Sequence, residues 1–157
     1  MIETVDLLAA LMSGPRRFAG AGVNHEGEDF GADLELRPLA GNAALMLQYA
    51  ATRADGVPAH LEDTLLGRDA AGRLCLWPVM EELPNVLPHR LKELTATDAG
   101  GLHAVFAFGI AEDRHGFREE ITIERGPTGT LVYAHAWGLP GGEFAPRSRC
   151  ELQPASS

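Results

Sequence analysis

The stretch Asn42–Met80 reads NAALMLQYAATRADGVPAHLEDTLLGRDAAGRLCLWPVM, and it decides the fold class of this chain. Its three apolar-rich runs are separated first by Asp55-Gly56 and then by Asp69–Gly72. Asp-Gly between two alternating runs is a strong hairpin signal, because the tight turn needs positive φ at both central residues. The stretch therefore predicts three antiparallel strands that follow one another in a meander.

Turn signals punctuate the rest of the chain at similar intervals, and they predict about ten strands. Most connections are too short for a crossover helix, so consecutive strands must pair antiparallel. Closing such a meander into an up-and-down barrel removes its exposed edges. The expected strands are residues 18–26, 30–39, 42–54, 58–67, 73–80, 88–97, 102–111, 117–125, 130–138 and 143–152.

The chain is expected to form one domain, because 157 residues suffice for a single core. Residues 1–13 carry apolar side chains at spacings of three and four, which predicts a short N-terminal helix. Residues 18–152 form the expected barrel, and residues 153–157 are expected to be a disordered tail. The small residues in Phe18–Val23 suit a first strand that bends sharply or is crossed closely by another segment.

Composition excludes several classes of protein. A net charge of −9 disfavours a nucleic-acid partner, which would require clustered Lys and Arg. No apolar run approaches the roughly 18 residues of a membrane span, and Glu3 and Asp6 stand where a secretory signal would carry basic residues. Cys75 and Cys150 are interpreted as reduced thiols of a cytoplasmic protein, although a disulfide between them stays open.

Alternation along the strands indicates which faces point inward. Leu45, Leu47 and Tyr49 share one face of the third expected strand, and Phe106 and Phe108 share one face of the seventh. We expect these faces to line the barrel.

The order of these features resembles the calycin architecture: an N-terminal helical segment, a Gly-rich strand at Phe18–Gly22, and meandering strands that end in the Arg-rich Arg147–Leu152. That group includes lipocalins, fatty-acid-binding proteins, nitrobindin-like haem proteins and bacterial families of unknown function. The segments Arg37–Gly41 and Leu65–Asp69 are most like the uncharacterised bacterial members. The resemblance implies an all-β, calycin-like barrel with an interior cavity.

No residue pattern supports catalysis. The sequence has no Gly-x-Ser-x-Gly motif, and the adjacent carboxylates of Glu81-Glu82 and of Glu119-Glu120 face opposite sides of a strand. Cys75 lies in an apolar strand, where a thiol is typically a small hydrophobic residue. A binding protein is therefore favoured over an enzyme, and no catalytic residue is assigned.

The favoured function is the binding of a small hydrophobic molecule in the barrel cavity. The candidate ligand-binding residues combine aromatic walls with polar groups that orient the ligand, and they are Tyr49, Trp77, Phe106, Phe108, His135 and Arg149. A homodimer that pairs exposed apolar strand faces is the structural alternative.

Six histidines raise the alternative of a haem or metal protein. None of them has the His-Glu-x-x-His or close His-x-His spacing of a metal site, so no metal and no cofactor is assigned. His135 shares a face with Tyr133 and Trp137. A late-strand histidine binds haem iron in nitrobindin-like barrels, so the resemblance implies that His135 is the haem candidate. The alternative function is thus a haem- or metal-binding barrel that uses His135 or His60.

His60, Glu62 and Thr64 share one face of the fourth expected strand. This face is interpreted as the solvated outside of the barrel, since exposed strand faces are normally polar, with a polar cavity lining as the alternative. If this face is solvated, Asp63 on the opposite face points inward, and its buried carboxylate would need an arginine from the last strand.

The segment Met80–His89 breaks the rhythm of the strands, because proline cannot sit in a central strand. We expect a longer loop at the mouth of the barrel. Its apolar residues Leu83, Val86 and Leu87 form either a partner surface or a plug of the barrel end.

Overall fold

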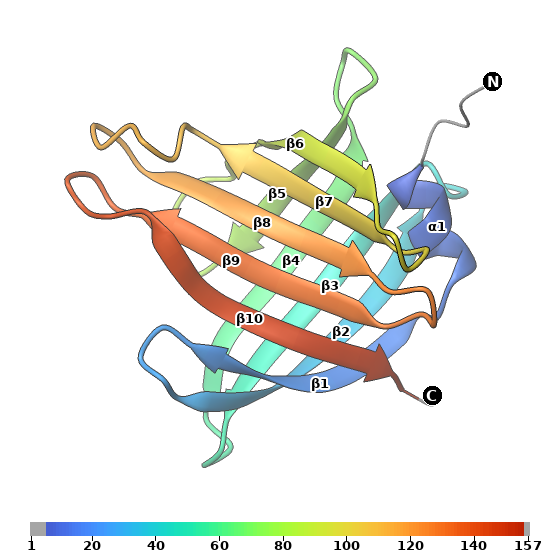
Figure 1. Cartoon of the computed structure of the whole chain (residues 1–157), viewed down its shortest axis with the longest axis horizontal. Helices are drawn as coiled ribbons and strands as arrows, with labels where there is room; N and C mark the ends of the chain where they lie inside the picture. Colours follow the sequence, from blue (N-terminus) through green and yellow to red (C-terminus); the bar gives the residue numbers. More distant parts are fainter. Residues whose placement is uncertain (1–5, 156–157) are drawn as a thin grey trace.

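Ten antiparallel strands form a closed barrel in the computed structural model, which describes residues 6–155 (Figure 1). The strands pair in chain order, and β1 closes the ring by pairing with β10. The strands are β1 (Arg17–Asn24), β2 (Asp29–Leu39), β3 (Ala44–Arg53), β4 (Pro58–Arg68), β5 (Leu74–Met80), β6 (His89–Ala96), β7 (Leu102–Phe108), β8 (Arg118–Arg125), β9 (Leu131–Gly138) and β10 (Ala145–Pro154). The predicted all-β meander is confirmed, and no strand boundary is off by more than three residues.

One helix, α1 (Leu7–Ser13), lies at one end of the barrel among the described residues, in contact with β2 and β3 (Figure 1). The Asp6 carboxylate caps it by accepting hydrogen bonds from two backbone N–H groups of the first turn. Its leucines are buried in the barrel core. The predicted helix began at residue 1, but residues 1–5 lie outside the described residues. Within residues 6–155 no helix is long and apolar enough to cross a membrane.

The barrel interior changes from apolar to polar along its axis. Along β4 the inward positions run from Leu66 through Thr64 and Glu62 to His60, in the direction away from α1. Leu66 and its cross-strand neighbour Leu45 are fully buried in the apolar core beside the helix. The core thus occupies the end that α1 covers, and the polar positions lie beyond it.

The face of β4 that was expected to be solvated points inward instead. Leu61 is 57% exposed, whereas Glu62 and Thr64 are 2% and 0% exposed. The expectation was wrong because β9, on the far wall, supplies Tyr133 and His135 as hydrogen-bond partners for the buried carboxylate. Burial of a charged group is tolerated where such partners exist.

At two glycines, Gly20 and Gly22, β1 approaches its neighbours too closely for a side chain to fit. A Cβ atom on Gly20 would lie 1.9 Å from the backbone oxygen of Glu151 in β10. A Cβ atom on Gly22 would lie 2.4 Å from the ring of Phe30. Of the two expectations for the first strand, a sharp bend or a close approach by another segment, the close approach is confirmed.

The last strand is longer than expected. Gln153 and Pro154 were assigned to a disordered tail, but they pair with Ala19 and Phe18 of β1. These two pairs help to close the ring. Residues 156–157 of the expected tail lie outside the described residues.

Arg118 ties together the loops at the end of the barrel opposite α1. Its guanidinium donates hydrogen bonds to the carbonyl oxygens of Ala111, Leu139 and Gly142, at 3.0, 2.8 and 2.6 Å. A Cβ atom on Gly138 would lie 2.7 Å from the guanidinium carbon. The arginine therefore requires a residue without a side chain at this end of β9. The buried arginine therefore holds two rim loops in place.

We expect the Gly20→Ala substitution to lower the free energy of unfolding by about 2–4 kcal/mol, because the new methyl group overlaps the β10 backbone. Gly31→Ala in β2 is the matched control, since a Cβ atom there meets no atom within 4 Å. We expect the control to change stability by less than about 1 kcal/mol. Urea unfolding of both variants is the measurement, and equal losses of stability would contradict the close approach of β1 and β10.

Candidate functional site

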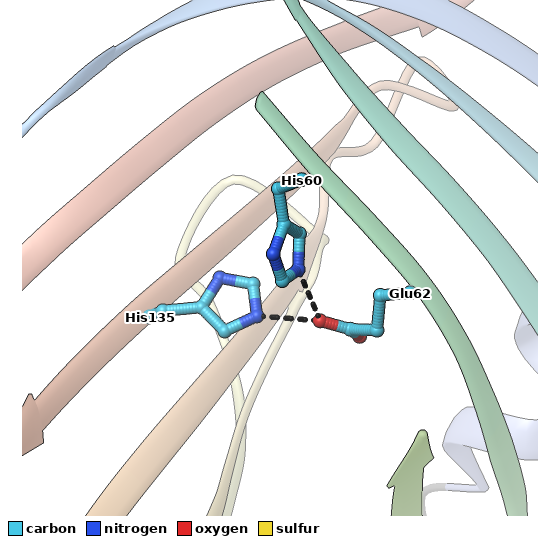
Figure 2. Close-up of side chains that lie close together, drawn as sticks. All are labelled: His60, Glu62 and His135. Carbon is cyan, nitrogen blue, oxygen red and sulfur yellow. Dashed lines mark hydrogen bonds and ion pairs between the residues drawn. The ribbon is translucent and has the colours of Figure 1, made fainter. Parts of the chain in front are cut away.

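A buried carboxylate, that of Glu62, lies at the centre of a polar network inside the barrel (Figure 2). Its Oε1 atom lies 2.9 Å from His135 Nε2 and 3.1 Å from His60 Nε2. Its Oε2 atom accepts hydrogen bonds from Thr64 Oγ1, at 2.5 Å, and from the Tyr133 hydroxyl. Four partners therefore surround a single carboxylate that is shielded from solvent.

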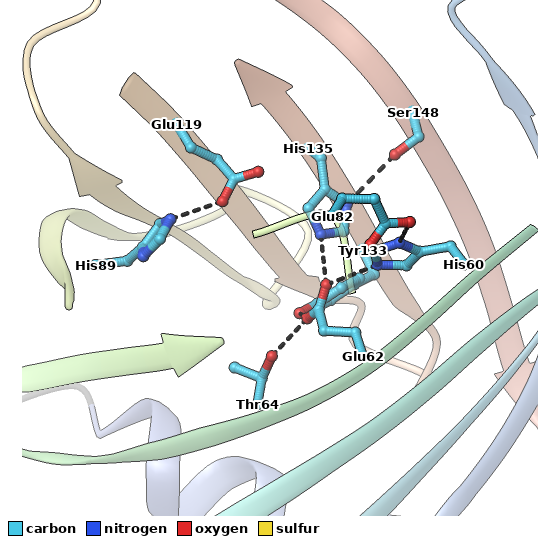
Figure 3. A network of polar contacts seen from close by, with 9 residues as sticks. All are labelled: His60, Glu62, Thr64, Glu82, His89, Glu119, Tyr133, His135 and Ser148. Carbon is cyan, nitrogen blue, oxygen red and sulfur yellow. Dashed lines mark hydrogen bonds and ion pairs between the residues drawn. The ribbon is translucent and has the colours of Figure 1, made fainter. Parts of the chain in front are cut away.

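The network joins opposite walls of the barrel. His60, Glu62 and Thr64 are alternate residues of β4, so their side chains share one face. Tyr133 and His135 stand in the same relation on β9. β4 and β9 are five strands apart in either direction round the ring, so the contacts between them cross the lumen (Figure 3).

Further groups hold the outer atoms of the two imidazoles (Figure 3). His60 Nδ1 lies 2.9 Å from Oε1 of Glu82, in the loop between β5 and β6. His135 Nδ1 lies 3.3 Å from Oγ of Ser148 on β10. Both rings thus turn their Nε2 atoms toward Glu62.

Electrostatics determine the protonation of this network. Burial raises the pKa of the Glu62 carboxyl. The charge of His135 and hydrogen bonds from both histidines lower this pKa by more, so it lies well below the usual range. Burial lowers the pKa of His60, and hydrogen bonds with Glu62 and Glu82 outweigh this effect and raise it to about 9. Burial and the Glu62 charge raise the pKa of Tyr133 well above normal. At neutral pH we therefore expect a carboxylate, an imidazolium at His60 and a neutral phenol.

A cavity of about 630 Å³ opens at the end of the barrel opposite α1. His60, His135 and Ser148 contribute to its lining and connect it to the buried network. Its apolar wall includes Phe30, Tyr49, Ala51, Leu87, Phe117 and Trp137. The cavity therefore combines an apolar wall with one polar region.

A second buried pair, His89 with Glu119, lies beside the cavity and apart from the Glu62 network (Figure 3). His89 Nε2 lies 2.7 Å from Glu119 Oε1, and its Nδ1 donates to the carbonyl oxygen of Leu87 at 2.7 Å. β6 pairs with β5 through only two residue pairs, Cys75 with Arg90 and Leu76 with His89. The contacts of His89 thus connect β6 to β8 at the point where the pairing of β6 with β5 is short.

The structure brings only part of the predicted ligand-binding set to the cavity. Tyr49 and His135 line it. Phe106 is fully buried within the apolar core. Phe108 lies between the rings of His89 and Phe117, with centroid distances of 5.9 and 6.4 Å.

Two predicted lining residues, Trp77 and Arg149, lie on the outside of the barrel. Trp77 alternates with the core residues Leu74 and Leu76, and Val79, two positions further on the same face, is 53% exposed. The side chain of Arg149 is 55% exposed and lies near the acidic groups of Glu124 and Glu151. The expectation that both line the lumen is corrected, because the strand register turns them outward.

The loop Glu81–Pro88 follows β5 as predicted, and Leu83 and Leu87 line the mouth of the cavity. Val86 is 54% exposed. The two cysteines, Cys75 and Cys150, are free and buried in the structure.

Sequence reasoning missed Glu62 and Tyr133 as members of the site. The sequence signal for Glu62 is its position two residues after His60, which places a carboxylate and an imidazole side by side on one strand face. For Tyr133 the signal is its shared face with His135. Neither signal identifies the partner strand.

No family model matches the chain, and no curated protein matches it. Among solved structures, the crystal structure of Rv2717c from M. tuberculosis is similar over 98% of this chain and 100% of that chain, with a TM-score of 0.75 and 14% identity. A de novo designed fluorescence-activating β-barrel aligns with a TM-score of 0.44 and 9% identity, over 97% of this chain and all of that one. The likeness to the mycobacterial protein supports the barrel fold and is limited to it.

We expect Glu62→Gln to lower the free energy of unfolding by about 3–5 kcal/mol, because it leaves buried polar partners without their carboxylate. Glu124→Gln is the matched control, because Glu124 pairs with His103 on partly exposed side chains. We expect the control to cost less than about 1 kcal/mol. Denaturant unfolding followed by circular dichroism compares them, and a neutral Glu62→Gln variant would show that the network does not stabilise the fold.

Proposed function

We propose that this chain is a calycin-like barrel that binds a small, largely apolar molecule in the cavity opposite α1. The observation that carries the proposal is the cavity itself, whose volume of about 630 Å³ suits a small organic ligand. Apolar and aromatic side chains make up much of its lining, and a few polar groups converge on one region. This combination favours a ligand with an apolar body and a polar end near His60 and His135.

Charge at the cavity favours a neutral or cationic ligand over an anionic one. Exposed acidic side chains from the β1–β2 turn, the start of β2 and the β5–β6 loop line its mouth. They outnumber the two arginines that also line it. The acidic residues are Glu26, Glu28, Asp29 and Glu82, and the arginines are Arg53 and Arg147. Together with the net charge of −9, this excess repels anions from the entrance.

Haem ligation by His135 receives less support from the contacts. His135 Nε2 lies 2.9 Å from Glu62 Oε1 and its Nδ1 lies 3.3 Å from Ser148 Oγ, so neither ring nitrogen faces a space wide enough for a haem plane. Haem stays a prediction from the resemblance, and a Soret band on haemin titration that persists in His135→Ala would refute this ligand assignment. A homodimer and a cytoplasmic location likewise stay predictions.

Binding of the neutral dye Nile red, whose fluorescence rises in apolar surroundings, tests the proposal. We expect binding by the parent chain and at least a tenfold loss of affinity, about 1.4 kcal/mol, in Ala51→Phe, because Ala51 lines the cavity and the ring would fill part of it. The anionic dye 1-anilinonaphthalene-8-sulfonate should bind more weakly than Nile red.

The matched control is Ala50→Phe, the same substitution one position earlier on β3, which places the ring on the outer face of the barrel. We expect it to bind Nile red like the parent chain. Equal affinity in both variants, or no dye binding by the parent chain together with no co-purified molecule in native mass spectrometry, would contradict the proposal.

A further inference from the structure

Three side-chain atoms of the buried network converge in a way that suits a metal ion (Figure 2). Nitrogen atoms of His60 and His135 and an oxygen of Glu62 all lie within 4.8 Å of one another. Glu62 Oε1 is 2.9 and 3.1 Å from the two Nε2 atoms. Ligands that lie about 2.0–2.2 Å from a tetrahedral zinc ion are roughly 3.3 Å apart, which is close to this spacing.

We propose that His60, Glu62 and His135 bind one divalent first-row transition metal ion, and that Zn²⁺ is the ion the donor set fits best. Two imidazoles and one carboxylate form a donor set found in zinc proteins, whereas the hard ions Mg²⁺ and Ca²⁺ take oxygen ligands. The metal site does not depend on an organic ligand in the cavity, so the proposal of metal binding and the proposal of ligand binding are tested independently.

Each of the three metal ligands is oriented by a neighbour on the side away from the metal position (Figure 3). His60 Nδ1 contacts the Glu82 carboxylate, and His135 Nδ1 contacts the Ser148 hydroxyl. The second oxygen of Glu62 accepts hydrogen bonds from Thr64 and Tyr133. Such outer contacts fix the ring orientation and the tautomer of metal-binding histidines, and they leave the inner atoms for the ion.

The metal takes the place of protons in this arrangement. Without metal, N–H groups of His60 and His135 bridge the gap to Glu62 Oε1. On binding, each Nε2 proton passes to solvent from an imidazolium or to Nδ1 of the same ring from a neutral imidazole. The freed Nε2 lone pairs and the carboxylate then coordinate the ion. No oxidation or reduction is involved.

The ion has a route to the site and an open coordination position. The side chain of His60 is 21% exposed, and both histidines line the cavity, whereas Glu62 is shielded behind them. The acidic side chains at the cavity mouth attract cations. Three protein ligands leave a fourth position, as in zinc sites that bind water or a small molecule.

Other histidine–acid pairs of the described residues lack a third ligand. His89 with Glu119 and His103 with Glu124 each bring together one imidazole and one carboxylate. Across residues 6–155, His60, Glu62 and His135 are the one group of three such side chains close enough to share an ion. The His103–Glu124 pair therefore offers a control for the metal-binding test.

Cobalt titration of the full chain, produced without a polyhistidine tag and treated with a chelator, tests the site. We expect one Co²⁺ per chain, with the intense visible bands of a low-coordinate ion, and displacement of Co²⁺ by Zn²⁺. His60→Gln should weaken the affinity by at least about 100-fold, more than the loss of an outer contact. His103→Gln, from a partly exposed pair, should bind like the parent chain.

Glu82→Gln keeps the test decisive if a ligand variant does not fold. Glu82 is exposed in a loop, and its loss should weaken Zn²⁺ binding about tenfold without unfolding the barrel. Nile red binding by the chelator-treated chain reports the cavity separately. The metal site is refuted if the parent chain binds no Co²⁺ or Zn²⁺, or if the losses in His60→Gln and Glu82→Gln are no greater than in His103→Gln.

Discussion

The contacts of Glu62 with Tyr133 and His135 are the interaction on which the interior of this barrel depends. They connect β4 with β9, which face each other across the lumen. A buried carboxylate costs several kcal/mol unless donors surround it, so these contacts fix which face of each strand points inward. They also divide the lumen into the apolar core beside α1 and the cavity at the opposite end.

The two halves of the lumen have different physical roles. Burial of leucines and aromatic rings beside α1 supplies the hydrophobic stabilisation of the fold. A buried ionic network usually stabilises a protein less than apolar residues of the same volume would. We infer that the network at Glu62 is explained by binding, since an apolar lumen would serve stability as well.

Turn spacing and alternation predicted the ten strands, their pairing and the inward faces of β3 and β7, because these patterns are local. The register of β4 was not predictable in the same way, because two of the partners that compensate the burial of Glu62, Tyr133 and His135, are 71 and 73 residues away in the chain. Trp77 was misplaced because β5 is apolar on both faces, so alternation gave no preference. His60 and His135 were named as alternative haem or metal ligands, but their convergence with Glu62 was not predictable, because the two histidines come from strands on opposite walls and not from one motif.

A double-mutant cycle between Glu62 and Tyr133 tests the cross-lumen contact most directly. The free energies of unfolding of Glu62→Gln, Tyr133→Phe and the double variant are measured by denaturant titration of the chelator-treated chain. The account predicts a coupling energy of about 1–3 kcal/mol, since the two side chains share a buried hydrogen bond. Additivity within about 0.5 kcal/mol would contradict it, because independent residues add within that margin.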